Sequence, residues 1–451
     1  MQGVKNLTQG PILKQLLNLA LPIMATSFVQ MAYNLTDMAW LGRLGSKSVA
    51  AVGAVSILIW FTSSISLLTK VGSEVTVAQA IGAKRNDEAK VYASHNSTIA
   101  LIISIVWALI LFSSAIPLVS LYQLDADISS KAVDYLRIVS TAIPFTFLAT
   151  TFSGVYNASG RSKIPFYLSG TGLVANMILD PLLIFGLGPI PGLGTIGAAI
   201  ATWTSQFIVF ILFIYALRSK AQLMGGFSLV TRLQWKYTKR ILQIGTPVAL
   251  LNSLFAVINM FMCRIASITG GHIGLMSMTT GGQIEAITWN TSQGFSTALG
   301  AFVAQNFAAS KIIRVFKAYR ATLFMTSVFG IISTVLFVFF GNEVFSIFVP
   351  DPEAYEQGGN YLRISGYSQM LMMLEITTQG LFYGTGRTVP AAVVSVAGNV
   401  LRIPLALGLV ALGWGIDGIW WAISFSCMLK GLVLFIWFIL MKRRILSTHV
   451  E

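Results

Sequence analysis

The chain contains an internal repeat, in which similar membrane-like segments return about 225 residues later. Short insertions in loops explain why the offset drifts by a few residues along the repeat. Two similar halves in a membrane protein are typical of a transporter, because two lobes can move around a site between them. The recurring pairs are Lys14 and Lys239, Leu17 and Leu242, Pro22 and Pro247, Asn34 and Asn259, Val77-Ala78-Gln79 and Val303-Ala304-Gln305, Gly154 and Gly380, Asn176 and Asn399, and Pro181 and Pro404.

The composition places the repeat in a membrane. Hydrophobic residues make up 55% of the chain and charged residues only 10%, with a mean hydropathy of +0.75. A soluble domain carries about 25% charged residues. A chain of 451 residues has room for roughly twelve spans of about 20 residues with short loops. We therefore expect an all-α integral membrane protein.

Twelve apolar runs are found, six in each half. An even number of spans gives both repeats the same orientation, so the pseudo-twofold axis runs along the membrane normal. We expect an N-lobe over 1–218, a basic cytoplasmic linker over 219–239, and a C-lobe with a short basic tail over 240–451. The predicted spans are 14–41, 47–70, 94–118, 136–158, 164–187, 195–218, 240–266, 274–300, 318–341, 358–383, 388–412 and 416–441.

The net charge of +14 is distributed unevenly over the loops. If both termini face the cytoplasm, nearly all basic residues lie in inner segments, as the positive-inside rule requires. Because they are scattered over many loops, they indicate contact with anionic membrane lipids rather than with nucleic acid. We expect a multi-pass protein of the inner (cytoplasmic) membrane. The residues left for the outer loops are Arg43, Lys47, Lys131, Asp125, Asp127, Asp351, Glu353, Glu356 and Asp417.

The sequence lacks the motifs of an enzyme or an ATP-driven pump. It has no Walker-type phosphate loop, no His-Glu-x2-His and no Gly-x-Ser-x-Gly. Cys263 and Cys427 lie inside apolar runs and form no metal-ligand pattern. We expect no cofactor, only a transported ion.

Two acids within the apolar runs, Asp37 and Asp180, are both expected to reach the outer half of the first lobe. Counting from the cytoplasmic ends of spans 1 and 5, they lie roughly 34 Å and 24 Å along their helices. Tyr33 and Asn176 each lie one turn before an acid, and Thr202 lies roughly 10 Å from the outer end of span 6. These carboxylate, amide, phenol and hydroxyl groups suit a proton or a small cation.

Alternative explanations of the two acids remain open from the residues alone. Asp37 could cap a helix near the outer surface, and Asp180 could satisfy backbone groups freed by Pro181. Pro22 removes a backbone donor in span 1, which is compatible with a gating bend or with a static kink. The positions equivalent to Asp37 and Asp180 in the second half hold Met262 and Ile403, so the charge is placed in one lobe only.

Other ionisable residues occur within or near the spans. Lys70 and Glu74 lie close enough to a predicted span end for their charged groups to reach the interface. Arg402 and Lys430 are deeper, and structural and functional roles are both open for them. Glu285 and Glu375 stand among methionines and aromatic residues, a setting that suits adaptable binding of apolar cations or ordinary helix packing.

Several motifs together resemble the multidrug and toxic compound extrusion (MATE) transporters over essentially the whole chain. The resemblance implies two six-helix lobes and cation-coupled efflux of organic, often cationic, compounds. The motifs are Leu21-Pro22, Tyr33-Asn34-x2-Asp37, Val77-Ala78-Gln79 with Gly82-Ala83, Asn176-x3-Asp180-Pro181, Ile184-Phe185-Gly186, and Gly194-x2-Gly197-Ala198-Ala199-x-Ala201-Thr202.

The resemblance also implies roles for individual residues. Those that match the family's N-lobe cation site are Asp37, Asp180, Asn176, Thr202 and Tyr33, the first four as ligands if the ion is sodium. Pro22 matches its gating position in the first helix. One branch of the family has acids in spans 7 and 10, whereas here span 7 has none and Glu375 is displaced by about a turn. The chain therefore resembles the prokaryotic DinF-type branch more closely.

The function expected is a secondary active antiporter that exports drugs or metabolites by alternating access, driven by protons or sodium ions. We expect a monomer with a small organic substrate. The alternatives are a lipid-linked oligosaccharide flippase of the same superfamily and a membrane-embedded lipid enzyme. The candidate substrate-binding residues are Asp37, Glu285, Glu375, Met262, Asn34 and Asn259.

The predicted orientation is tested by labelling single cysteines in intact cells. Cysteines placed at Asp127 and Asp351 should react with an impermeant reagent added outside, and a cysteine at Lys236 should not. Labelling at Lys236 in sealed right-side-out cells would overturn the orientation.

Overall fold

The computed structural model describes residues 4–122, 124–187, 190–219, 226–349 and 351–448. Part of the predicted linker, 220–225, and the end of the predicted tail, 449–451, lie outside the described residues. The described chain is helical apart from one short hairpin, and it divides into two compact units. Unit 1 comprises Met1–Gly10, Leu21–Ala249 and Ala304–Ser310, and unit 2 comprises Pro11–Ala20, Leu250–Val303 and Lys311–Glu451.

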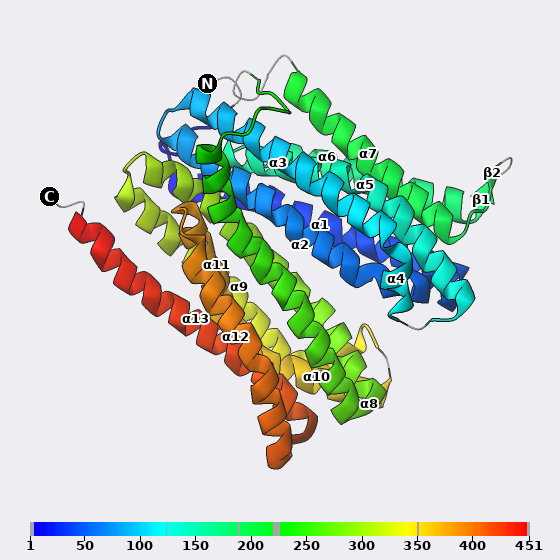
Figure 1. The fold of residues 1–451 in the computed structure, drawn as a ribbon. Helices are drawn as coiled ribbons and strands as arrows, with labels where there is room; N and C mark the ends of the chain where they lie inside the picture. The colour runs from blue at the N-terminus through cyan, green and yellow to red at the C-terminus, as the bar shows by residue number, and fades with distance from the viewer. Residues whose placement is uncertain (1–3, 123, 188–189, 220–225, 350, 449–451) are drawn as a thin grey trace. The chain divides into compact units, whose positions relative to one another are not determined.

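Unit 1 is a helical bundle in which α5 takes the central place. This helix packs against α2, α3 and α7, and α6 packs against α7 (Figure 1). The elements, in chain order, are α1 (Ile12–Leu44), α2 (Ser46–Gly82), α3 (Asn86–Ser113), α4 (Ala115–Ser120), α5 (Ala126–Ala158), α6 (Lys163–Ile184), β1 (Gly186–Leu187), β2 (Ile190–Pro191) and α7 (Thr195–Arg218).

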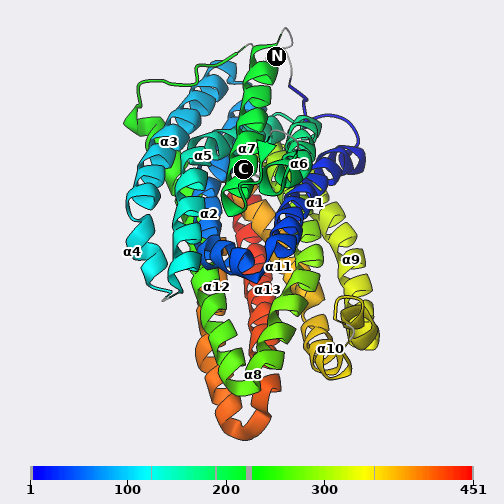
Figure 2. The same ribbon diagram turned by 90° about the vertical axis from the view of Figure 1, so that its right-hand side faces the viewer.

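Unit 2 holds most of α8 and all later helices. The 74-residue α8 contains two of the predicted spans, separated at Gly271, where the backbone leaves helical geometry at φ 61°. The tenth predicted span is divided into α10 and α11, and α12 runs beside α13 (Figure 2). The elements are α8 (Trp235–Ala308), α9 (Ile312–Ser346), α10 (Pro352–Gly366), α11 (Gln369–Gly384), α12 (Thr388–Leu409), the π-helical turn η2 (Val410–Trp414) and α13 (Gly415–Thr448).

The helices of unit 1 extend beyond the apolar runs from which they were predicted. α2 continues to Gly82, so Glu74 lies inside the helix rather than near its end. Its side chain is buried and accepts a hydrogen bond of 2.9 Å from Asn157 Nδ2 on α5. The expectation that Glu74 reaches the membrane interface is therefore wrong, because a partner on a neighbouring helix satisfies the carboxylate within the bundle.

The segment before α8 is attached to α3. The backbone N–H of Gln234 donates to His95 Nε2 at 3.0 Å, and that of Thr231 donates to Thr98 Oγ1 at 2.9 Å. His95 is buried. Side chains of α3 thus hold this part of the chain against unit 1. The segment is therefore more than a flexible connection between the repeats.

The equivalent prolines of the two repeats lie near the points where the chain passes from one unit to the other. The first turns of α1 belong to unit 2, and the chain enters unit 1 at Leu21, next to Pro22. The first turns of α8 belong to unit 1, and the chain leaves it after Ala249, close to Pro247. A proline removes one helical hydrogen bond, so each first helix is weakened near this passage.

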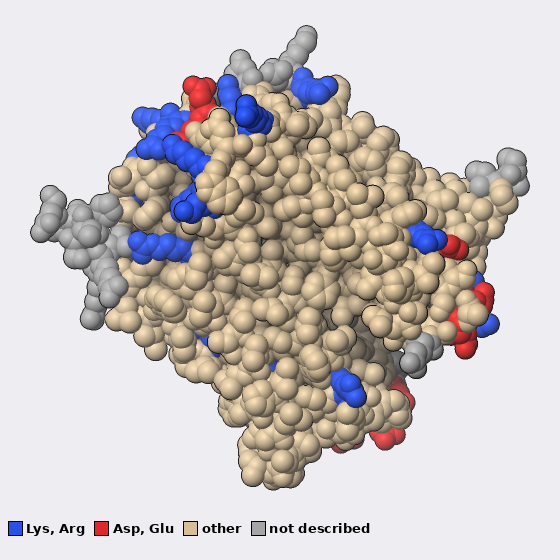
Figure 3. All heavy atoms as spheres, in the orientation of Figure 1, with Lys and Arg blue, Asp and Glu red and all other residues tan. Residues whose placement is uncertain are grey.

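Charged residues are distributed unevenly along unit 1. Lysine and arginine side chains predominate at the end where α2 meets α3, with a few acidic ones among them, whereas both signs occur together at the opposite end, near α4 and the start of α5 (Figure 3). At that opposite end Asp127 pairs with Lys131 at 3.0 Å. The uneven distribution agrees with the charge asymmetry found in the sequence.

A close helix contact in unit 1 requires glycine at Gly197. A Cβ at this position would collide with the backbone of Leu183 on α6, whereas a Cβ at Gly170 on the same helix α6 would meet no atom within 4 Å. Gly197 therefore sets how closely α7 approaches α6, the pair of helices that carries Asp180 and Thr202.

We predict that Gly197→Ala destabilises the protein by about 1–3 kcal/mol, the usual cost of forcing extra volume into a packed interior. The matched control, Gly170→Ala, should be neutral or stabilising because alanine favours helix. Thermal unfolding of the purified variants in detergent measures the difference. Equal melting temperatures for the two variants would show that the α6–α7 contact adapts freely.

Candidate ion-coupling site

Polar side chains from α1, α6 and α7 meet in the interior of unit 1. Thr202 Oγ1 on α7 donates to Asp37 Oδ2 on α1 at 3.3 Å. On α6, Asn176 Nδ2 donates to Asp180 Oδ1 at 3.2 Å. Asn176 and Asp180 are fully buried and Asp37 is 9% exposed. Asp37 and Asp180 lie within electrostatic reach of each other, so the structure brings together the four residues predicted as ligands.

The positions of the acids do not support the structural alternatives. Asp37 lies inside α1, which continues to Leu44, so it does not cap the helix. Asp180 is bonded to Asn176, and its second oxygen has no partner among the described residues, so it does not satisfy backbone groups freed by Pro181. The amide and the carboxylate of α6 face the same side because they are four residues apart on a helix.

Two site residues were not found from the sequence. Tyr135 on α5 is 3% exposed and lies within electrostatic reach of both Asp37 and Asp180. Ser205 is fully buried one turn after Thr202, beside the hydroxyl of Tyr33. The periodicity of α7 could have indicated Ser205, but a tyrosine on a distant span gives no signal in a search for buried charges.

Tyr33 closes one side of the cluster. Its hydroxyl donates to the backbone oxygen of Thr202 at 3.5 Å, and its side chain is 7% exposed. This bond joins α1 to α7 at the level of the acids. Tyr33 therefore lies beside the acids and contacts the backbone of Thr202, and its role in the site remains a prediction.

Several oxygen atoms of the cluster have no hydrogen-bond partner in the described part of the chain. They are Asp37 Oδ1, Asn176 Oδ1, Asp180 Oδ2 and Ser205 Oγ. Buried polar atoms are normally paired, because an unpaired one costs free energy. A set of carboxylate, amide and hydroxyl oxygens in an apolar bundle suits a proton or a hard cation, which takes oxygen ligands.

The equivalent positions in unit 2 are apolar, as the sequence indicates. Met262 is 1% exposed within the hydrophobic core, and Ile403 packs against the same core. The duplicated scaffold thus keeps a carboxylate pair in unit 1 and fills its counterpart in unit 2 with hydrocarbon.

Glu375 forms a buried ion pair in unit 2. Its Oε2 lies 3.2 Å from Lys430 Nζ, and its Oε1 accepts from Ser395 Oγ at 2.6 Å and from Gln379 Nε2 at 3.0 Å. Lys430 also donates to Asn399 Oδ1 at 3.0 Å. These contacts join α11, α12 and α13, so Glu375 and Lys430 satisfy each other within the unit.

Glu285 lies in a second polar group of unit 2. Tyr361 OH donates to its Oε2 at 2.7 Å and Gln369 Nε2 to its Oε1 at 2.7 Å. Arg402 lies within electrostatic reach of this carboxylate, and its Nε donates to Ser426 Oγ at 2.7 Å. Unlike Glu375, Glu285 has no arginine or lysine within ion-pair distance among the described residues.

The remaining substrate candidates lie in different settings. Asn34 on α1 and Asn259 on α8 are exposed, in unit 1 and unit 2 respectively, whereas Met262 is part of the core. Their role in binding remains a prediction.

Two similar sets of membrane-length helices, with a buried acid pair in one of them, define a secondary transporter. The MatE family model matches residues 22–182 and 247–407, two segments with the same spacing as the internal repeat. The chain belongs to the MatE family, whose members are transporters and not enzymes.

Curated relatives cover most of the chain. A probable multidrug resistance protein NorM of Thermotoga maritima is 26% identical over 403 residues, which cover 88% of this chain and 86% of the relative. An FAD transporter of Shewanella oneidensis is 27% identical over 424 residues, covering 93% and 92% respectively.

Solved structures share the fold. A crystal structure of a MATE transporter in the bent conformation superposes with a TM-score of 0.93 at 21% identity, and the match covers 99% of this chain and 98% of the other. A MOP superfamily transporter from Pyrococcus furiosus gives 0.88 at 22% identity, covering 96% of each chain. The predicted all-helical membrane fold with two six-helix lobes is confirmed.

We predict that Lys430→Met destabilises the protein by about 3–5 kcal/mol, because it leaves the Glu375 carboxylate buried without its cation. Adding Glu375→Gln to Lys430→Met should restore most of the stability, since both charges are then absent. Thermal unfolding of the two single variants and the double variant measures this coupling. Additive losses would show that the two residues do not act as a pair.

Proposed function

We propose that this protein is a cation-coupled antiporter that exports organic, often cationic, compounds by alternating access. The observation that carries the proposal is the buried cluster around Asp37 and Asp180, with unpaired oxygens from four side chains. Membership of the MatE family and the naming of several relatives as multidrug resistance proteins support it. The relative named as an FAD transporter extends the candidate substrates to anionic metabolites.

The acid pair is the proposed binding site for the coupling ion. Two carboxylates this close titrate as a unit, so one can hold a proton while the other stays charged. A sodium ion would take Asp37 Oδ1, Asp180 Oδ2 and Asn176 Oδ1, the atoms that lack partners, together with the Thr202 hydroxyl. Either ion reduces the charge of the cluster and so changes the contacts between α1 and the helices α6 and α7.

Pro22 is the proposed gating position. α1 carries Asp37 in unit 1, while its first turns belong to unit 2, and Pro22 lies next to this passage. A change in the contacts of Asp37 would therefore act on a helix that is already weakened between the two units.

The DinF-type branch is supported by the distribution of acids. The first part of α8, the seventh predicted span, contains no carboxylate, and Glu375 is engaged by Lys430. The coupling site is accordingly assigned to unit 1 alone. The proposal also includes a monomer. Both termini are placed in the cytoplasm because of the distribution of basic residues.

We predict that Asp37→Asn folds but loses ion-driven efflux, because the amide cannot take up or release the coupling ion. Asp180→Asn should behave alike, and the double variant should be little worse than either single one, as expected of residues that act as a unit. Efflux from proteoliposomes, driven separately by a pH gradient and a sodium gradient, measures the effect and identifies the ion.

The control is Glu375→Gln combined with Lys430→Met, which removes both charges of the buried pair in unit 2. This variant should keep ion-driven efflux. Its complete loss in well-folded protein would move the coupling site to unit 2. Normal ion dependence in Asp37→Asn would show that the acid pair is structural.

A further inference from the structure

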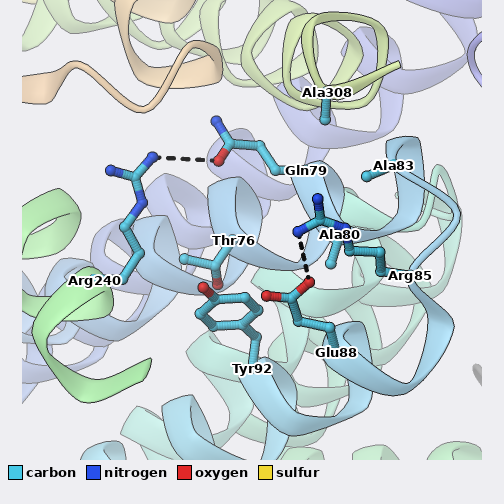
Figure 4. Close-up of a pocket in the computed structure, with 9 residues that line it drawn as sticks. All are labelled: Thr76, Gln79, Ala80, Ala83, Arg85, Glu88, Tyr92, Arg240 and Ala308. Carbon is cyan, nitrogen blue, oxygen red and sulfur yellow. Dashed lines mark hydrogen bonds and ion pairs between the residues drawn. The ribbon is translucent and has the colours of Figure 1, made fainter. Parts of the chain in front are cut away.

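A small cavity of about 230 Å³ opens in unit 1, away from the acid pair. It lies between the end of α2, the start of α3 and both ends of α8 (Figure 4). The cavity is smaller than the roughly 300–1,000 Å³ typical of pockets for drug-sized ligands, so its size suits a single polar headgroup. Its polar lining consists of Thr76, Gln79, Arg85, Glu88, Tyr92 and Arg240.

The lining carries charges of both signs, two arginines and one carboxylate. Arg240 on α8 donates to Gln79 Oε1 at 3.5 Å, and Arg85 pairs with Glu88 at 3.2 Å across one turn of α3. Figure 4 shows Arg240 on the side opposite Arg85, with the Glu88 carboxylate and the Tyr92 hydroxyl toward the middle. Tyr92 lies within electrostatic reach of both arginines and of Glu88. The lining therefore offers partners for both an anionic and a cationic group.

We propose that this cavity binds the phosphoethanolamine headgroup of a phospholipid in the cytoplasmic leaflet. Arg240 and Arg85 would hold the phosphate, for which the guanidinium group has matching geometry. Glu88 would accept hydrogen bonds from the primary ammonium group. The inference rests on the proposed orientation of the protein, with the α2–α3 turn in the cytoplasm, and on no assumption about the transported compound.

The cavity lies at the depth expected of a lipid headgroup. Trp235 begins α8 one and a half turns before Arg240 and is 69% exposed. Tryptophan is enriched at the boundary between membrane and water, and basic pockets on the cytoplasmic side bind lipid headgroups. Lysines and arginines also gather at this end of unit 1 (Figure 3). The expected depth of the cavity in the membrane and the positive charge around it therefore favour binding of a lipid phosphate.

Reorganising the cavity around a ligand costs little. The side chain of Arg85 is 69% exposed and that of Glu88 is 23% exposed, and an ion pair of this kind contributes about 0–1 kcal/mol. The bond from Arg240 to Gln79 is at the upper limit of hydrogen-bond length and uses one of the five guanidinium N–H groups. Both arginines can turn to a phosphate without breaking a strong interaction.

The repeat shows that the duplicated scaffold does not create this charge pattern by itself. At the positions of Glu88 and Thr76 the second repeat has Arg314 and Phe302, and the Arg314 guanidinium lies over the Phe302 ring at 5.6 Å. Gln15 occupies the position of Arg240 and accepts a hydrogen bond from Arg314 at 3.4 Å. In unit 2 the equivalent residues thus contact one another, and no carboxylate is among them.

Lipid binding would attach the start of α8 to the α2–α3 turn within unit 1. Arg240 belongs to the first turns of α8, while Arg85 immediately precedes α3 and Glu88 lies in its first turn. A headgroup held by all three residues would fix the beginning of the second repeat to the α2–α3 turn. Binding should therefore stabilise the protein against thermal unfolding.

The test measures the melting temperature of the purified full-length protein in detergent with added short-chain lipids. Phosphatidylethanolamine should raise the melting temperature more than phosphatidylglycerol, which has no ammonium group, and more than phosphatidylcholine, whose quaternary ammonium has no N–H. Free phosphoethanolamine should give a smaller rise at millimolar concentration. This readout involves no transport, so its failure is distinct from failure of the proposed function.

The variants are Arg240→Gln, Arg85→Gln and Glu88→Gln, with Lys236→Gln as the matched control on α8 outside the cavity. Arg240→Gln should remove at least half of the shift caused by phosphatidylethanolamine, and the exposed Arg85 gives a second variant if Arg240→Gln is poorly folded. Glu88→Gln should remove the preference for phosphatidylethanolamine over phosphatidylglycerol. Lys236→Gln should keep both.

Three results would overturn the proposal. One is an equal shift with phosphatidylglycerol and phosphatidylethanolamine that Glu88→Gln leaves unchanged, which would indicate general attraction of anionic lipid. Another is an undiminished shift in both arginine variants, which would place the lipid elsewhere. The third is the absence of any lipid-dependent shift in the unmodified protein.

Discussion

The structure depends on the cost of burying charge inside helices that are surrounded by hydrocarbon. A charged side chain in such a bundle must find a partner, reach the interface, or bind an ion. Each of the interior carboxylates described above follows one of these solutions. Glu74 is held by an amide, Glu375 by a lysine, and Glu285 by a phenol and an amide. Asp37 and Asp180 differ, because each keeps an oxygen without a partner among the described residues.

This difference separates the charges that have partners within the described bundle from the two that are proposed to bind the coupling ion. The Glu375–Lys430 pair and its neutral neighbours complete one another, so nothing in the arrangement needs an exchangeable ion. The cluster in unit 1 is incomplete, and its donors are groups that bind protons and hard cations. The second repeat differs in the same way, since Met262 and Ile403 place apolar side chains at the positions of the two acids.

The sequence predicted much of this arrangement and missed parts of it for physical reasons. Hydrophobic runs located the spans, because hydrocarbon requires about 20 apolar residues. They gave the wrong end for α2, which continues past Glu74. The Glu74 carboxylate accepts a hydrogen bond from Asn157, a residue 83 positions away. Helical spacing grouped Asn176 with Asp180, and helix lengths placed Asp37 in the outer half of the same lobe. Tyr135 was not predicted, because its position near the acids depends on the packing of α5 against α2, α3 and α7. No local sequence pattern reveals that packing.

The division of the chain into compact units has a consequence for the origin of the molecule. Unit 1 takes residues from the start of the second repeat, and unit 2 takes Pro11–Ala20 from the start of the first. Neither repeat therefore contains a complete unit of its own. Before the duplication, a single six-helix polypeptide with this architecture would have completed itself only by exchanging its first helical turns with an identical copy, as in a domain-swapped dimer. Fusion of the two genes would have made that exchange permanent.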